Sequence, residues 1–70
     1  MKTFIYFKSG NVYQIDLDSV RDQDDPVNLL DWFWEQSDAV LQATYLTTDH
    51  TTGQLLFKLS EVESIEQGRY

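Results

Sequence analysis

Residues 3–17 have the sequence TFIYFKSGNVYQIDL, in which two strand-like runs are separated by a short turn. The first run, residues 3–7, consists of β-branched and aromatic residues. The second, residues 12–17, alternates with period two, so that Tyr13, Ile15 and Leu17 share one face. Gly10 lies between the runs and can adopt the positive φ that a tight turn requires. The stretch therefore predicts a hairpin of two antiparallel strands.

A helix is predicted downstream, from Pro26 to about Ser37. Asp25 is its expected N-cap because its side chain is an acceptor, and Pro26 suits the first helical position, where no N–H is needed. At about 100° per residue, one arc of this helix holds the apolar residues Val27, Leu29, Leu30, Phe33 and Trp34. Trp32 falls outside the arc, so its indole is expected to point towards water beside acidic side chains.

Three further strands are predicted after the helix. Residues 39–47 and 54–59 flank a polar loop at 49–53 and form a second hairpin, and residues 62–66 follow a turn as a short last strand. Residues 68–70 are expected to fray. The order β-β-α-β-β-β corresponds to an α+β fold with two layers, a mostly antiparallel twisted sheet of four to five strands and one covering helix. Phe33 and Trp34 are expected to be buried against the sheet.

The composition indicates one small folded domain, residues 1–70. The chain is 41% hydrophobic and contains two Trp, four Tyr and four Phe, which is too apolar for a disordered acidic tail. It has no cysteine and one histidine, so disulfides and a Cys/His zinc site are excluded. No apolar run approaches the ~20 residues that span a bilayer, and no signal-peptide layout is present. We therefore expect a cytoplasmic domain stabilised by packing or self-association.

All of the net charge lies in residues 16–38. The chain has a formal net charge of −7, and this stretch carries eight acids against Arg21 alone, which also gives −7. The acids are Asp16, Asp18, Asp22, Asp24, Asp25, Asp31, Glu35 and Asp38. A concentrated negative field attracts basic partners and repels nucleic-acid phosphates, so direct nucleic-acid binding is not expected.

No catalytic or metal-binding motif is recognisable. An EF-hand loop that starts at Asp16 would place Val20 at its fifth position, one that starts at Asp22 would place Pro26 there, and neither register supplies the required Gly at the sixth. His50, the only imidazole, lies in a Thr-rich loop with just Asp49 beside it, and the glycines are too isolated for a phosphate-binding loop. Asp22, Asp24 and Asp25 are expected to cap the helix or to lie in a solvated loop. Weak binding of Mg²⁺ or Ca²⁺ by these three acids is the less favoured alternative. We expect no enzyme activity, no cofactor, no small-molecule substrate and no membrane contact.

Trp32 and the acids together predict a protein-protein interface. Tryptophan is enriched at binding hot spots, and an acidic rim steers a basic partner towards them. The leading hypothesis is a non-enzymatic module that engages a basic protein surface or a second copy of itself through Trp32, Asp16, Asp18, Asp22, Asp24, Asp31 and Glu35. Two alternatives are a phage-type nucleic-acid mimic that inhibits a DNA- or RNA-handling enzyme, and a solvated face without a partner.

The two ends of the chain carry a resemblance. Residues 7–13, FKSGNVY, and residues 57–66, FKLSEVESIE, resemble segments of small uncharacterised proteins of Gram-positive bacteria and their prophages. The resemblance implies a bacterial cytoplasmic or phage context, and it carries over no functional residue.

Overall fold

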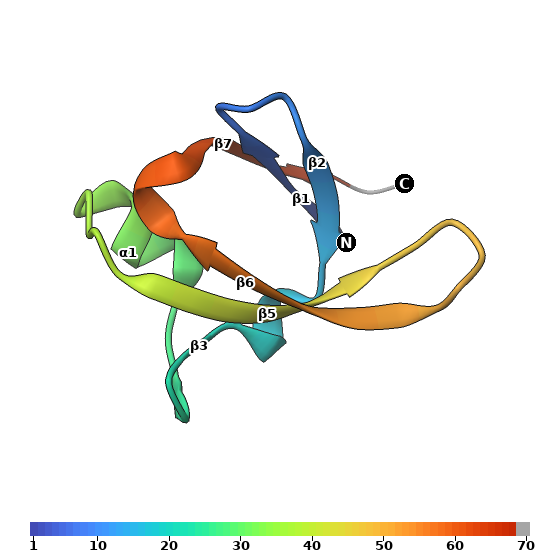
Figure 1. The fold of residues 1–70 in the computed structure, drawn as a ribbon, viewed down its shortest axis with the longest axis horizontal. Coiled ribbons are helices and arrows are strands. Elements are labelled where there is room, and N and C mark those ends of the chain that lie inside the picture. The colour runs from blue at the N-terminus through green and yellow to red at the C-terminus, as the bar shows by residue number, and fades with distance from the viewer. Residues whose placement is uncertain (69–70) are drawn as a thin grey trace.

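Both predicted hairpins are present, and they belong to one sheet (Figure 1). Strands β1 (Lys2–Phe7) and β2 (Val12–Ile15) form the first, with Gly10 at a φ of 97° in its turn. Strands β5 (Val40–Leu46) and β6 (Thr52–Lys58) form the second. The computed structural model describes residues 1–68. Gly68 was predicted to fray, but it is the last residue of strand β7 (Val62–Gly68). The predicted fraying of residues 69 and 70 lies outside the described part.

The sheet is antiparallel and curls over itself. Its main strand order is β7-β1-β2-β5-β6, in which β2 joins the two hairpins through the pairs Gln14 with Leu46 and Ile15 with Tyr45. A small hairpin of β3 (Arg21–Asp22) and β4 (Asp25–Pro26) is attached to β5 on the edge opposite β6. Figure 1 shows β1, β2 and β7 on one side of the interior and β5 and β6 on the other.

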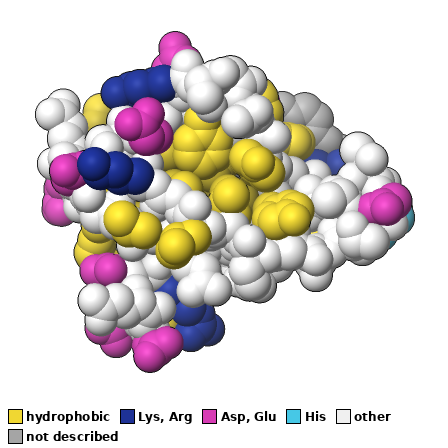
Figure 2. All heavy atoms as spheres, in the orientation of Figure 1, with side chains coloured by type: hydrophobic (Ala, Val, Ile, Leu, Met, Phe, Trp, Pro, Cys, Tyr) yellow, Lys and Arg dark blue, Asp and Glu magenta, His cyan; other side chains and the backbone are white. Residues whose placement is uncertain are grey.

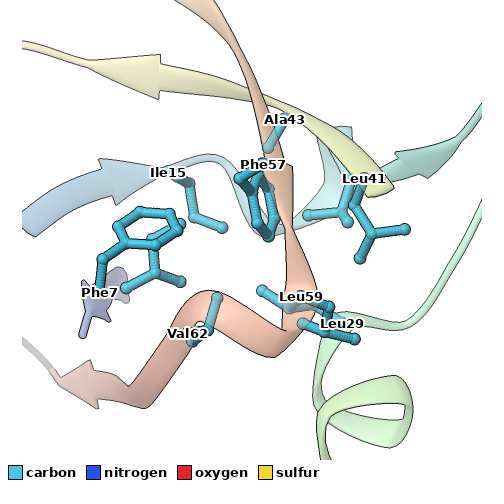
Figure 3. Close-up of a cluster of buried hydrophobic side chains, with 10 residues drawn as sticks. Phe7, Ile15, Leu29, Leu41, Ala43, Phe57, Leu59 and Val62 are labelled. Atoms are coloured by element: carbon cyan, nitrogen blue, oxygen red, sulfur yellow. The ribbon is translucent and has the colours of Figure 1, made fainter. Parts of the chain in front are cut away.

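The hydrophobic core lies inside the curl (Figure 3). Its buried side chains come from both halves of the sheet and from the connections, and they are Ile5, Phe7, Ile15, Val20, Leu29, Leu41, Ala43, Phe57, Leu59 and Val62. Phe7 makes edge-to-face contacts with Tyr13 and Phe57, each with ring centroids 5.8 Å apart. Such pairs add about 0.5–1.5 kcal/mol beyond the burial of their area, so the rings tie β1, β2 and β6 together.

The predicted α+β arrangement with two layers is wrong. The described residues form seven strands, one six-residue helix, α1 (Leu29–Trp34), and two 3-10 helices, η1 (Leu17–Ser19) and η2 (Leu59–Glu61). The order also differs, because η1, β3 and β4 precede the helix and η2 precedes β7. The physical reason is that the curled sheet covers its own apolar face. The helix contributes one buried residue, Leu29, instead of a whole layer.

The helix begins later and ends earlier than predicted. Its N-cap is Asn28, whose Oδ1 accepts hydrogen bonds from the backbone N–H of Leu30 at 3.1 Å and of Asp31 at 3.2 Å. The predicted cap Asp25 and the predicted first residue Pro26 instead form β4. The prediction failed because a proline preceded by an acceptor side chain fits the start of a helix and the end of a short hairpin equally well.

The position of the cap gives a first testable prediction. Replacing Asn28 with alanine is expected to lower the free energy of unfolding by about 0.5–2 kcal/mol, because two N–H groups lose their acceptor. The matched variant Asp25→Ala is expected to have little effect, since Asp25 is exposed in β4 and caps no helix. Urea denaturation followed by circular dichroism measures both. A larger loss for Asp25→Ala would place the helix start back at Pro26.

Candidate interaction surface

The two tryptophans are oriented the opposite way from the prediction. Trp32 is half-buried and packs against the core, whereas Trp34 is 82% exposed. Trp32 and Phe33 follow the buried Leu29 by three and four residues, so they lie on the same face of the helix as Leu29. Trp34 lies about 140° away from Leu29 on the helix and points outward. The prediction failed because its arc assumed a longer helix that included Val27.

Trp34 lines a groove where the end of α1 meets η2. The groove is formed by three segments that are distant in sequence, and its lining residues are Lys8, Phe33, Trp34, Gln36, Ser37, Leu59, Ser60 and Val62. Leu59 and Val62 belong to the core, and Phe33 is half-buried against it. The groove therefore has an apolar floor with an exposed indole at its side. None of these lining residues was predicted to bind a partner.

Hydrogen bonds hold the helix side of the groove in place. After Glu35, the C-cap, Gln36 has a φ of 57°, and its N–H donates to the carbonyl oxygen of Phe33 at 3.1 Å. The N–H of Ser37 donates to the carbonyl oxygen of Trp32 at 3.2 Å. These two bonds form a Schellman motif, which satisfies the last helical carbonyls and stops the helix directly after Trp34.

The opposite side of the groove is also tied to the sheet. The N–H of Lys8 donates to the carbonyl oxygen of Glu61 at 2.9 Å, and the N–H of Leu59 donates to that of Ala39 at 2.9 Å. Both walls are therefore attached to the same framework. In a preformed groove of this kind, no free energy is needed to order the walls.

The acids fall into two groups. The hairpin acids are Asp16, Asp18, Asp22, Asp24 and Asp25, which lie in and around η1 and the β3–β4 hairpin. The helix acids are Asp31, Glu35 and Asp38 on and just after α1. The structure thus places Asp31 on the helix that carries Trp34 and Glu35 directly after it. The predicted residues Asp16, Asp18, Asp22 and Asp24 lie on or beside other elements. In the face shown in Figure 2, acidic side chains lie mainly towards the periphery.

Several acids already have local roles. The Asp16 side chain accepts a hydrogen bond from the N–H of Asp18 at 3.1 Å and caps η1. Asp22 and Asp25 are directly opposite each other in the small hairpin, an arrangement of like charges that destabilises a strand pair. Asp38 forms an exposed ion pair with Lys58 at 3.9 Å, of a kind that contributes little to stability. In residues 1–68, no three His, Asp or Glu side chains are grouped so that they could hold a metal ion.

Two perturbed pKa values occur away from the groove. The Asp49 carboxylate accepts hydrogen bonds from Thr47 and Thr51 at the tip of the β5–β6 hairpin, which lowers the pKa of Asp49. Tyr6 donates a hydrogen bond to Glu66 at 3.1 Å, and this bond raises the pKa of Tyr6. Asp49 is exposed and Tyr6 is partly exposed, and the largest cause of each shift is a local side-chain hydrogen bond. The exposed His50 lies in the same tip, and its backbone N–H donates to Thr47.

No family model, curated protein or solved structure matches this chain. No helix in the described residues has both the length and the apolar character needed to cross a membrane.

Proposed function

We propose that this protein is a non-enzymatic, cytoplasmic interaction module of bacterial or phage origin that binds a basic protein segment, with Trp34 as the anchor. The observation that carries the proposal is the 82% exposed indole beside an apolar groove in a chain of net charge −7. Tryptophan is a residue type enriched at binding hot spots, and acidic surroundings increase the rate at which basic partners arrive. The anchor therefore moves from Trp32 to Trp34.

Charge around the groove supports a basic partner. Glu35 lies between the lining residues Trp34 and Gln36, and Glu61 lies between Ser60 and Val62. Both glutamates are exposed, and Lys8 is the one cation in the lining. A segment with an apolar residue for the groove and Lys or Arg on either side complements this pattern. A cation placed over the exposed indole face would add about 0.5–1 kcal/mol.

The groove favours binding over catalysis. Its lining includes the hydroxyls of Ser37 and Ser60, but it includes no imidazole and no carboxylate that could act as a base. The mimic alternative requires carboxylates in long rows, whereas the hairpin acids are divided between η1 and a small hairpin, and one of them serves as a cap. No observation specifically favours that alternative.

A selection with random peptides tests the proposal. A displayed peptide library is selected on the immobilised wild-type protein and, in parallel, on Trp34→Ala. Peptides enriched on the wild type are expected to combine an apolar residue with Lys or Arg and to be missing from the Trp34→Ala selection. Enriched peptides that are neutral or acidic, or that bind both proteins equally, would contradict the proposal.

The hairpin acids are expected to act on the association rate. Changing Asp16, Asp18, Asp22 and Asp24 together to Asn retains the side-chain acceptors and removes four charges. The association rate of a selected basic peptide should then fall about tenfold at low salt, while its dissociation rate changes little. Stopped-flow measurements across a salt series check this, because the wild-type rate should fall towards that of the variant as salt rises. Equal rates at low salt would show that these acids are only solvated.

A further inference from the structure

Strand β6 has an edge with unpaired backbone groups. Among the described residues it pairs only with β5. Two backbone hydrogen bonds mark the ends of this pairing. At one end the N–H of Thr47 donates to the carbonyl oxygen of Thr51, and at the other the N–H of Leu59 donates to the carbonyl oxygen of Ala39. Hydrogen-bonded pairs alternate in an antiparallel ladder, so the odd-numbered residues of β6 bond to β5. The free edge therefore presents the N–H and C=O groups of Thr52, Gln54, Leu56 and Lys58.

Apolar side chains border this edge on both faces. On β6 itself, Leu56 is 71% exposed on the outer face and Leu55 is half-exposed on the inner face. Val40, on the neighbouring strand β5, is 51% exposed on the same outer face as Leu56. Figure 2 shows hydrophobic side chains gathered in the middle of the face, over the interior between the two halves of the sheet in Figure 1. An exposed strand edge with apolar neighbours is a template for pairing with another strand.

The charge distribution indicates which strand can approach. Strand β6 contains no acid and one cation, Lys58, and that cation already faces Asp38 at 3.9 Å. The β3–β4 hairpin, with Asp22, Asp24 and Asp25, is attached to the other edge of β5. The β6 edge is thus a charge-poor part of a chain of net charge −7. It lacks the charges that would select a basic or acidic peptide, and two copies that approached each other there would meet little local repulsion.

We propose that β6 pairs antiparallel with β6 of a second copy, around a twofold axis at Leu55. In this register Gln54 lies opposite Leu56 of the second copy, and Thr52 lies opposite Lys58. Every outward N–H then faces an outward C=O, because the set of four residues is symmetric about position 55. The two lysines fall at opposite ends, and Leu56 of both copies shares the outer face near the axis. Such an isologous pairing joins the two curled sheets into one continuous sheet.

This inference does not rest on the proposed function, and the two respond to salt in opposite ways. Binding of a basic segment weakens as salt rises. Pairing of two chains that each carry −7 strengthens, because salt screens their long-range repulsion. The groove at Trp34 remains outside the β6 pairing, so a dimer would display two grooves.

Sedimentation equilibrium of the purified protein tests the pairing at about 0.05 M and about 0.5 M NaCl. The wild type is expected to form a concentration-dependent dimer that is tighter at the higher salt. Leu56→Lys should raise the dimer Kd at least about tenfold, because it places like charges near the axis, and Gln54→Lys provides an independent second variant. Leu56 is exposed, and Gln54 makes only exposed side-chain hydrogen bonds, with Gln42 and Thr44, so the melting temperature of each monomer should change little. The matched control Trp34→Ala should dimerise like the wild type.

Amide hydrogen exchange tests the register in the same samples. At high protein concentration the amides of Gln54 and Leu56 should become protected, while those of Leu55 and Phe57, already bonded to β5, should not change. A protein that stays monomeric to about millimolar concentration at high salt would overturn the proposal. Loss of the dimer in Trp34→Ala, or protection without the alternation along β6, would also overturn it and place self-association on another surface.

Discussion

Replacing Phe57 with alanine is expected to lower the free energy of unfolding by about 3–5 kcal/mol, the range for removing a buried aromatic side chain. Phe57 is 6% exposed, and its ring contacts Phe7 edge to face at 5.8 Å inside the curl. Single domains have roughly 0.05–0.15 kcal/mol of stability per residue, so this loss is a large part of what a chain of this size has. Urea denaturation at 25 °C, followed by circular dichroism, measures the change.

The adjacent residue supplies a matched control. Leu56 lies on the same strand but points outward, so Leu56→Ala should change the free energy of unfolding by less than about 0.5 kcal/mol. The contrast tests the alternation along β6, because only the side chain that faces the interior of the curl belongs to the core. Similar losses for both variants would contradict the inward face assigned to β6.

Replacing Trp34 with alanine is expected to raise the Kd for a selected basic peptide at least about thirtyfold, which corresponds to a hot-spot loss of about 2 kcal/mol or more. The loss should appear mainly as faster dissociation, since the indole is a local anchor and the acids that act at long range are retained. Surface plasmon resonance or stopped-flow fluorescence separates the two rates.

Trp32→Phe is the control for this result. Trp32 packs against the core, so the variant should lose stability and keep its affinity within about threefold. The opposite pattern, with lost affinity in Trp32→Phe and unchanged affinity in Trp34→Ala, would favour Trp32 as the anchor, as the helical arc in the sequence predicts.

Local sequence signals predicted the two hairpins because those signals have a direct physical basis. Alternation in residues 12–15 and the glycine at position 10 act within a few residues of each other, and Gly10 indeed has a positive φ. Leu17 departs from the predicted strand because Asp16 caps η1 there. The small β3–β4 hairpin had no such signal, since two-residue strands show no period, and β3 is held through Arg21 opposite Gln42.

Contacts between distant residues account for what the sequence did not reveal. Gly53 was assigned to the polar loop, but it lies in β6 opposite Tyr45. The Tyr45 ring covers Gly53 so closely that a Cβ at position 53 would be 2.5 Å from the ring atom Cζ. The side chain of Asn28 decided the start of the helix, and with it which tryptophan faces outward. The position of the net charge could be predicted because it needs only the sequence. The groove could not, since η2, the first residue of β7 and the β1–β2 turn supply half of its lining residues.

The most direct test of the binding surface is a two-dimensional ¹H–¹⁵N NMR titration of the labelled protein with a selected basic peptide. We predict that the Trp34 indole N–H signal and the amides of Phe33, Ser37, Ser60 and Val62 shift together with one affinity. Shifts confined to β6 or to the β3–β4 hairpin, with the Trp34 indole unchanged, would contradict the assignment of the groove as the binding site.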